Sequence, residues 1–180
     1  MPETAPIRET PRLILRAHRR DDFAESAAMW ADSAVVRHIS GKPFTQEESW
    51  SRLLRYAGHW VLLGFGYWAV ETKDTGRFVG EVGFADYQRD MDPPQRGLPE
   101  AGWVIKTSQH GQGYATEALT CIVAWADRHI PCDRTFCIID PQHAASIKVG
   151  RKAGYGQDVM GSYRGQPTLV LTRPAAGVKA

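Results

Sequence analysis

Two glycines, one residue apart, separate a strand pattern from a helical pattern in the second half of the chain. The stretch reads Ser-Gln-His-Gly-Gln-Gly-Tyr-Ala-Thr-Glu-Ala over residues 108–118. Glycine tolerates positive φ and has no Cβ, so an anion can approach the backbone amides closely. The first amides of the following helix have no intrahelical partners and lie at the positive end of its dipole. The junction therefore predicts an anion site suited to phosphate, with an ordinary strand-to-helix turn as the alternative.

The segments around this junction predict one mixed α/β core. Apolar residues recur at spacings of three and four before Pro131, which is typical of an amphipathic helix, and Thr45 and Glu48 form a capping box at the start of another. Helices are predicted over residues 21–31, 46–59, 115–130 and 143–153. Strands are predicted over residues 12–16, 67–71, 78–84, 100–106, 134–139, 155–160 and 168–172. This order favours a mixed sheet with helices on both faces.

Composition excludes several classes of protein. The chain has 22 Lys and Arg against 20 Asp and Glu, which is too balanced for a nucleic-acid partner. It shows neither a run long enough to span a membrane nor a signal peptide, and its three cysteines indicate neither a disulfide framework nor a metal site. We expect a flexible leader over residues 1–11 and a single domain over residues 12–175. We therefore expect a soluble cytoplasmic protein without nucleic-acid, membrane or metal partners.

The glycine stretch fits neither of two common phosphate motifs. It lacks the lysine of a P-loop, and Thr116 stands where a dinucleotide fingerprint needs its third glycine. Residues 110–115 resemble instead the pyrophosphate-binding motif Q/R-x-x-G-x-G/A of the GNAT superfamily of acetyl-CoA-dependent N-acetyltransferases. Residues 10–16, 78–84 and 100–105 resemble that superfamily's first, third and fourth strands, and residues 140–155 resemble its later N-x-x-S segment. The resemblance covers residues 10–173, and the nearest branch looks like the RimJ/RimL group.

The resemblance implies the GNAT fold, an α/β (α+β) architecture with a largely antiparallel sheet of six to seven strands. Acetyl-CoA is then expected in a splay between the fourth and fifth strands, and CoA is the product. The implied cofactor-binding residues are Trp103, Val104, Ile105, His110, Gly111, Gln112, Gly113, Tyr114, Ala115, Thr116, His143, Ser146 and Arg151. This chain has His110 and His143 where the family motifs have Gln or Arg and Asn. Gly150 stands where many members have a tyrosine acid, which excludes that acid here.

Acetyl transfer to an amine needs a base, an oxyanion donor and an acid for the leaving thiolate. Glu100 is the predicted base, with a solvated strand-end charge as the alternative and Asp86 in reserve. A backbone N–H near Val104 or Ile105 is the predicted oxyanion donor. Ser146 is the predicted acid, a role that the RimJ/RimL-type branch implies, and its alternative is a local hydrogen bond at a helix start.

The sequence thus predicts direct transfer of an acetyl group from acetyl-CoA to the primary amine of a small molecule or peptide. Asp90 and Asp92 would favour a cationic amine if they line the acceptor cleft, although a solvated loop explains them equally well. A non-catalytic acyl-CoA-binding module of the same fold is the alternative, and a dinucleotide-binding oxidoreductase is a third reading. The sequence leaves open which amine is acetylated and whether the chain forms a homodimer.

Overall fold

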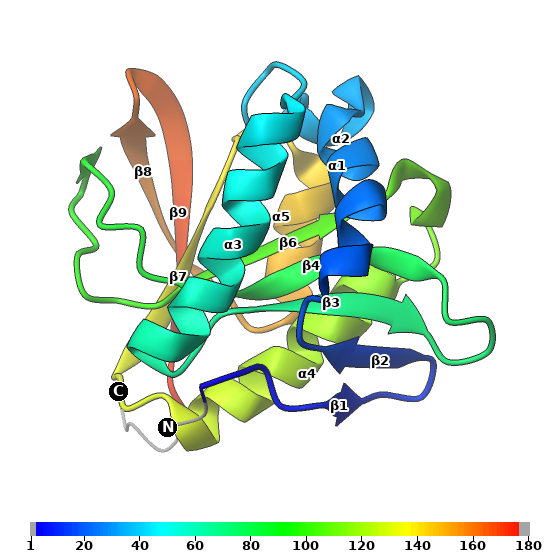
Figure 1. Cartoon of the computed structure of the whole chain (residues 1–180). Helices are drawn as coiled ribbons and strands as arrows, with labels where there is room; N and C mark the ends of the chain where they lie inside the picture. The colour runs from blue at the N-terminus through cyan, green and yellow to red at the C-terminus, as the bar shows by residue number, and fades with distance from the viewer. Residues whose placement is uncertain (1–2, 177–180) are drawn as a thin grey trace.

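The computed structural model describes residues 3–176 and shows strands and helices interleaved along the chain (Figure 1). The strands are β1 (Arg8–Glu9), β2 (Leu13–Arg16), β3 (Tyr67–Thr72), β4 (Phe78–Ala85), β5 (Met91–Asp92), β6 (Glu100–Ile105), β7 (Arg134–Ile139), β8 (Gln157–Tyr163) and β9 (Gln166–Pro174). The α-helices are α1 (Phe23–Ala31), α2 (Ser33–Val36), α3 (Gln46–Leu63), α4 (Tyr114–His129) and α5 (Ala144–Lys152). Two 3₁₀ turns, η1 (Arg20–Asp22) and η2 (Thr107–Gln109), precede α1 and α4.

The strands form one nine-stranded sheet in the order β1-β2-β3-β4-β6-β7-β9-β8-β5. Every neighbouring pair is antiparallel except β6 and β7, which run parallel. The prediction of a largely antiparallel mixed sheet is therefore confirmed. The sheet has two more strands than the seven predicted segments, because β1 and β5 are two residues long and too short to show a period of two.

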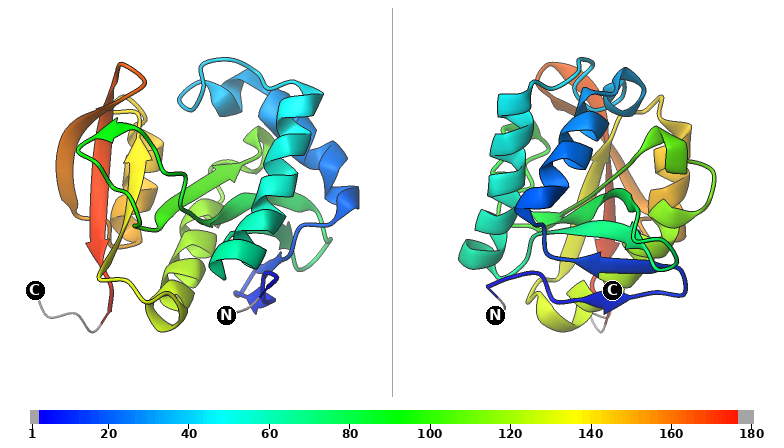
Figure 2. Two further views of the ribbon diagram at one scale, coloured as in Figure 1. Left: turned by 60° about the vertical axis from the view of Figure 1, so that its left-hand side comes forward. Right: turned by 45° about the vertical axis from the view of Figure 1, so that its right-hand side comes forward.

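Helices cover both faces of the sheet, as predicted (Figure 2). Helix α4 packs its buried residues Leu119 and Ile122 into the core that contains Val82 and Phe84 of β4. Helices α1 and α3 cover the other face. None of the helices between residues 3 and 176 combines the length and the apolar character needed to cross a lipid bilayer.

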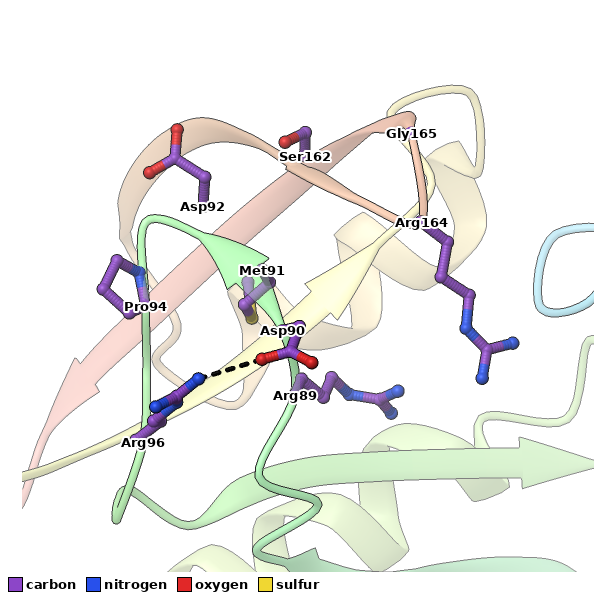
Figure 3. A pocket seen from close by; sticks show the side chains of 9 residues that line it. All are labelled: Arg89, Asp90, Met91, Asp92, Pro94, Arg96, Ser162, Arg164 and Gly165. Atoms are coloured by element: carbon purple, nitrogen blue, oxygen red, sulfur yellow. Dashed lines mark hydrogen bonds and ion pairs between the residues drawn. The ribbon is translucent and has the colours of Figure 1, made fainter.

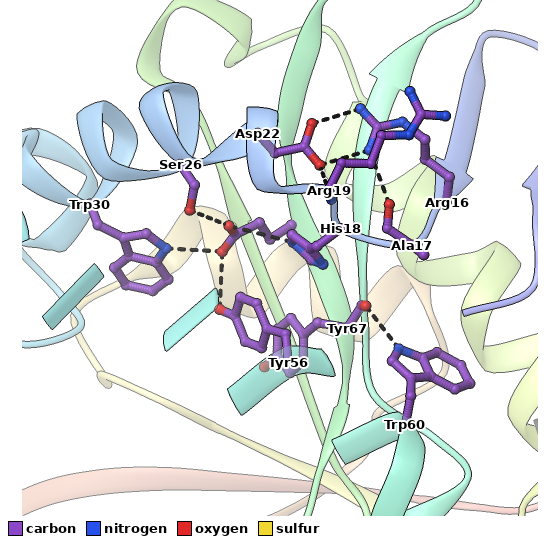
Figure 4. Close-up of polar contacts among 11 residues, drawn as sticks. Arg16, Ala17, His18, Arg19, Asp22, Ser26, Trp30, Tyr56, Trp60 and Tyr67 are labelled. Carbon is purple, nitrogen blue, oxygen red and sulfur yellow. Dashed lines mark hydrogen bonds and ion pairs between the residues drawn. The ribbon is translucent and has the colours of Figure 1, made fainter. Parts of the chain in front are cut away.

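Side chains of α1 and α3, among them Ser26, Trp30 and Tyr56 (Figure 4), form hydrogen bonds to a buried carboxylate. Glu81 of β4 is fully buried and accepts hydrogen bonds from Ser26 Oγ at 2.6 Å, Trp30 Nε1 at 2.9 Å and the Tyr56 hydroxyl at 3.0 Å. Burial raises the pKa of Glu81, but contacts with His18, Ser26 and Trp30 outweigh it and hold the pKa below its usual value. The ionised carboxylate thereby ties both helices to the sheet.

Two helical features differ from the prediction. Helix α3 extends to Leu63, because Gly64 provides the left-handed C-cap with a φ of 71°. Helix α2 was not predicted, since its four residues span little more than one turn. Asp32 caps this short helix by accepting a hydrogen bond from the Ala34 amide.

Residues 5–10, which the sequence predicts to be part of a flexible leader, contact the domain in this structure. Ala5 is buried, and the Trp68 indole donates a hydrogen bond to the Pro6 carbonyl at 2.8 Å. Arg8 and Glu9 form β1, which pairs with β2. The three prolines indicated a loop but gave no sign that its backbone docks on the domain.

Candidate active site

The parallel strands β6 and β7 separate almost as soon as they meet. Glu100 and Phe136 are the single residue pair in their register. The Phe136 amide donates a hydrogen bond to the carbonyl of Pro99, the residue before Glu100. From there the strands diverge, and Figure 2 shows β7 leaning away from β6. Three consecutive residues of β6, Gly102 to Val104, are only half-buried although the strand lies in the middle of the sheet. The sheet therefore has an opening at the position where the splay was predicted.

Alternation along β6 decides which of its amides face this opening. Lys106 directly follows β6, and its amide donates to the Val79 carbonyl of β4. Because the amides of a strand point alternately to its two neighbours, the even-numbered amides of β6 point toward β4. Odd-numbered amides point toward β7, and beyond the Glu100–Phe136 pair β7 offers them no partner. The amides of Trp103 and Ile105 thus face the opening, whereas the Val104 amide faces β4.

The glycine stretch forms a backbone cradle at the wide end of the opening. Gly111 and Gly113 have φ values of 76° and 80°, and Gly113 is the N-cap of α4. The amides of residues 113–116 make no hydrogen bond to any residue between 3 and 176. A Cβ on Gly111 would meet no atom within 4 Å, and one on Gly113 would meet only Arg12, at 3.5 Å. This geometry fits a pyrophosphate, because four adjacent amides without hydrogen-bond partners lie at a helix N-terminus.

An N-terminal arginine holds the cradle in place. Arg12 Nη1 donates to the Gln112 carbonyl at 2.9 Å, and its guanidinium lies 4.7 Å from the ring centroid of Tyr114. Arg12 Nε also donates to Glu117 at 2.7 Å, and the Thr10 hydroxyl donates to the same carboxylate at 2.6 Å. Burial raises the pKa of Glu117, but these hydrogen bonds lower it overall. The loop is thus fixed by residues about a hundred positions away in sequence.

The His110 side chain forms a hydrogen bond with the backbone. Its Nε2 lies 2.8 Å from the Ile105 carbonyl, and because a carbonyl only accepts, Nε2 must carry the proton. The hydrogen bond closes the turn between β6 and α4, so His110 shapes the cradle in this structure.

Imidazoles also line the β7 side of the wide end. His143, the N-cap of α5, stacks on His38, with ring centroids 4.4 Å apart. His38 Nδ1 lies 2.7 Å from Asp140, which follows β7, and this hydrogen bond lowers the pKa of Asp140. Burial and the neighbouring His38 lower the pKa of His143. The segment after α2 thus bridges to the turn between β7 and α5.

Glu100 stands at the narrow end of the opening. Its side chain lies on the same face of the sheet as Gly102. Tyr67 packs against Gly102 on this face and stacks on Tyr56 of α3, so Glu100 lies on the face that α3 covers. Its two carboxylate oxygens accept hydrogen bonds from Arg89 Nε at 2.6 Å and Arg89 Nη2 at 2.8 Å. Burial raises the pKa of Glu100, although Arg89 opposes that shift. Glu100 is therefore a buried, paired carboxylate and not a solvated strand-end charge.

Ser146 and Gly150 lie on α5. The Ser146 hydroxyl makes no hydrogen bond within residues 3–176, so it is not the local capping contact that was the alternative. A Cβ on Gly150 would meet the Trp103 ring at 3.5 Å, which shows that Trp103 reaches from β6 toward α5. The indole thus occupies space next to the position where relatives with a tyrosine acid carry that side chain.

The structure does not bring Arg151 to the cradle. Its guanidinium is paired with Asp158 and donates to the Tyr155 and Gly156 carbonyls, so it joins the end of α5 to the start of β8. The contact of Arg151 with a phosphate therefore stays a prediction, and in this structure both of its Nη groups have partners at the end of α5 and the start of β8. Sequence reasoning missed Arg12, Arg89 and His38, whose partners are distant in sequence and leave no local pattern.

An opening between two parallel strands, with an anion cradle at one end and a buried carboxylate at the other, defines a class of acyltransferase that binds CoA thioesters. Residues 12–156 match the family described as Acetyltransferase (GNAT) domain, and the chain belongs to this family of N-acetyltransferases, which transfer an acetyl group from acetyl-CoA to an amine.

Comparison with individual proteins agrees with this family. The chain is 23% identical over 141 residues to the uncharacterized N-acetyltransferase p20 of Bacillus licheniformis, covering 78% of this chain and 76% of that one. An acetyltransferase from Agrobacterium tumefaciens superimposes with a TM-score of 0.76 at 24% identity, over 94% of both chains. RimL, a ribosomal L7/L12 α-N-protein acetyltransferase solved with coenzyme A, superimposes with a TM-score of 0.74 at 14% identity, over 96% of this chain and 100% of that one. At these identities both structures show the fold.

Proposed function

We propose that acetyl-CoA binds in the opening between β6 and β7 and that the acceptor amine reaches it from the face covered by α1 and α3. The observation that carries this proposal is the single-pair contact between β6 and β7 beside the cradle of residues 110–116. The free amides at the start of α4 would hold the pyrophosphate. His143 and Ser146 at the start of α5 line the other side of the channel for the pantetheine arm. Bound acetyl-CoA supplies an activated thioester carbonyl.

The amides of Trp103 and Ile105 are the proposed oxyanion donors. Both point toward the opening and lack a partner on β7. Backbone donors fixed in a strand need no reorganisation when charge develops on the carbonyl oxygen. This assignment replaces Val104, whose amide faces β4.

Glu100 and Ser146 are the proposed base and acid. The amine nitrogen attacks the thioester carbon, the C–S bond breaks, and the amine loses one proton while the thiolate gains one. Glu100, at the narrow end and on the acceptor face, would take the amine proton, directly or through a water. Ser146, on the first turn of α5, has an uncommitted hydroxyl that would donate to the thiolate. A raised pKa brings the Glu100 carboxyl closer to the range in which a base works efficiently.

A non-catalytic acyl-CoA-binding module remains the second candidate because position 150 lacks the tyrosine acid. Within the catalytic proposal, the fold shared with RimL fits an α-amine of a peptide or a small amine of similar size. We take that likeness as a reason to include peptides among the acceptors tested.

The test has two stages. Thermal melts with acetyl-CoA, CoA, ATP and NADH should show stabilisation by the CoA compounds alone, by several degrees at about 100 times the dissociation constant. Release of CoA is then followed with a panel of amines. Binding without any turnover would favour the non-catalytic module, and stabilisation by NADH alone would refute the proposal.

The roles of Glu100 and Ser146 are tested by Glu100→Gln and Ser146→Ala. The pH profile of kcat/KM should rise through the raised pKa of Glu100 as the carboxylate forms, and Glu100→Gln should remove this limb with a loss of about 10²–10⁴-fold. An unchanged CoA affinity and melting temperature would separate this effect from misfolding. Wild-type activity in Glu100→Gln would exclude it as the base.

A further inference from the structure

A pocket of about 470 Å³ lies outside the cofactor opening, between the loop that joins β4 to β6 and the turn that joins β8 to β9 (Figure 3). The loop contributes Arg89, Asp90, Asp92 and Arg96, and the turn contributes Arg164. Three arginines therefore line the pocket, two from the loop and one from the turn. A volume of this size can hold a small-molecule ligand.

The pocket adjoins the narrow end of the opening. Arg89 lines it and also binds Glu100, the first residue of β6 and the only one paired with β7. The pyrophosphate cradle follows the other end of the same strand. A ligand in this pocket therefore lies beside the proposed base and away from the cradle, as an acceptor must.

Among residues 3–176, pairing of the charged groups at the pocket leaves Arg164 and Asp92 without an ion-pair partner. Arg89 is balanced by Glu100, and Arg96 by Asp90 at 2.9 Å. The Arg164 side chain makes no ion pair or hydrogen bond with any residue from 3 to 176. Its guanidinium lies 5.1 Å from the ring centroid of Tyr163. Arg89 still has two unused N–H groups, since three of its five donors are bonded.

Asp92 also lines the pocket, but it does not neutralise Arg164. Its main chain pairs with Ser162, and Figure 3 shows its carboxylate directed away from the guanidinium groups of Arg89 and Arg164. Those two guanidinium groups extend toward the same side of the pocket (Figure 3). The Tyr163 ring contacts both of them, with its hydroxyl accepting from Arg89 at 2.8 Å.

Arg164 is held in an unfavourable backbone conformation. Arg164 and Gly165 form a two-residue turn with φ values of 53° and 74°, which is the pattern of a type I′ hairpin. Asn, Asp or Gly is strongly preferred at the first position, because a side chain with a bulky stem is strained at positive φ. An arginine kept at a strained turn that lines a pocket points to a role for its guanidinium.

We propose that this pocket binds a carboxylate of the amine acceptor, held by Arg164 together with the unused donors of Arg89. The inference rests on the proposed function and narrows its substrate class to amines that carry a carboxylate near the reacting nitrogen, such as free amino acids or short acidic peptides. It reverses the expectation from Asp90 and Asp92 of a cationic acceptor. The planar fork of arginine matches the two oxygens of a carboxylate.

The experiment compares free amino acids with their amides in wild type and in Arg164→Asn. Asparagine suits the turn, so this variant should fold with an equal or higher melting temperature while losing the guanidinium. For each protein, kcat/KM for the amino acid is divided by kcat/KM for its amide. The wild-type ratio divided by the ratio of the variant gives a double ratio in which the intrinsic reactivity of each amine cancels. We expect this double ratio to be about tenfold. An acidic dipeptide and its amidated form distinguish a peptide acceptor from a free amino acid.

Arg77→Asn is the matched control. Arg77 is an exposed arginine at the end of another hairpin connection, between β3 and β4, and its double ratio should stay near one. Arg164→Lys keeps the charge without the fork and should recover part of the effect. A double ratio near one in Arg164→Asn, or a general preference for polyamines over amines with a carboxylate, would overturn the proposal.

Binding separates failure of this inference from failure of the proposed function. If no amine is acetylated, N-acetylated amino acids and their amides are titrated onto the protein in the presence of CoA. About tenfold tighter binding of the carboxylate form, lost in Arg164→Asn, would uphold the pocket without catalysis. Equal binding of the two forms would refute it.

Discussion

Replacing Gly102 by alanine tests the packing beside the narrow end of the opening. A Cβ at this position would lie 2.0 Å from the Tyr67 hydroxyl oxygen, about 1.4 Å closer than the 3.4 Å at which ordinary contact begins. Tyr67 cannot retreat easily, because it is buried and its ring stacks on Tyr56 at a centroid distance of 4.4 Å. Tyr56 is in turn fully buried and bonded to Glu81.

Overpacking of this kind costs about 1–3 kcal/mol. For a chain of this length, about 2 kcal/mol corresponds to a fall in Tm of about 4–8 °C, measured by calorimetry or circular dichroism. Tyr67→Phe removes the clashing oxygen, so the double variant should recover about 1–2 kcal/mol relative to the sum of the single variants. The ring carbon Cζ at 3.1 Å would still need a small shift.

A matched control is Gly58→Ala in α3, where an added Cβ meets nothing within 4 Å. This change should raise stability by about 0.5–1 kcal/mol, since alanine favours helix more than glycine does. The reasoning would be refuted if Gly102→Ala and Tyr67→Phe were strictly additive, or if Gly102→Ala left Tm unchanged.

Two further predictions concern the cradle and the C-terminal strand. Arg12→Ala removes the hydrogen bond to the Gln112 carbonyl and should weaken acetyl-CoA binding about fivefold in calorimetric titration, whereas an unchanged dissociation constant would show that the cradle holds its shape alone. Asp127 accepts hydrogen bonds from Arg173 at 2.7 and 2.6 Å, which lower its pKa below the unfolded value of about 3.9. Its contribution to stability is therefore complete above that value and is lost as the pH falls through the lower folded pKa. Asp127→Asn should lower Tm by about 2–4 °C at pH 7 and converge with wild type well below pH 4, and a deficit that persists in acid would contradict this.

Elements with a clear period were predicted from the sequence almost to the residue. The strand over 134–139 has the predicted bounds, and the helix over 114–129 differs from its prediction by one residue at each end. The cradle followed from the same local chemistry, since glycine conformations and helix amides depend on adjacent residues. The opening between β6 and β7 came only from the family resemblance, because strand pairing is not encoded in either strand alone.

Two of the predicted cofactor-binding residues have partners that the sequence did not indicate. Arg151, assigned to the cofactor from its place on α5, is paired with Asp158, seven residues later on a different element. His110 places its Nε2 2.8 Å from the Ile105 carbonyl. Each side chain has several partners within reach, and only the folded backbone selects among them. The acceptor pocket was beyond the sequence for the same reason, since its walls lie about 70 residues apart in the chain.

The contacts of Glu117 connect the N-terminal segment to the proposed cofactor cradle. The family match begins at residue 12, yet the Thr10 hydroxyl that anchors Glu117 lies before that boundary. A chain that begins at residue 12 would keep the glycine stretch and lose an anchor of the loop that this stretch forms. We expect such a chain to bind acetyl-CoA more weakly and to exchange the amides of residues 111–114 faster with deuterated solvent. The start of the family match and the start of the segment that supports the cradle are therefore two different positions.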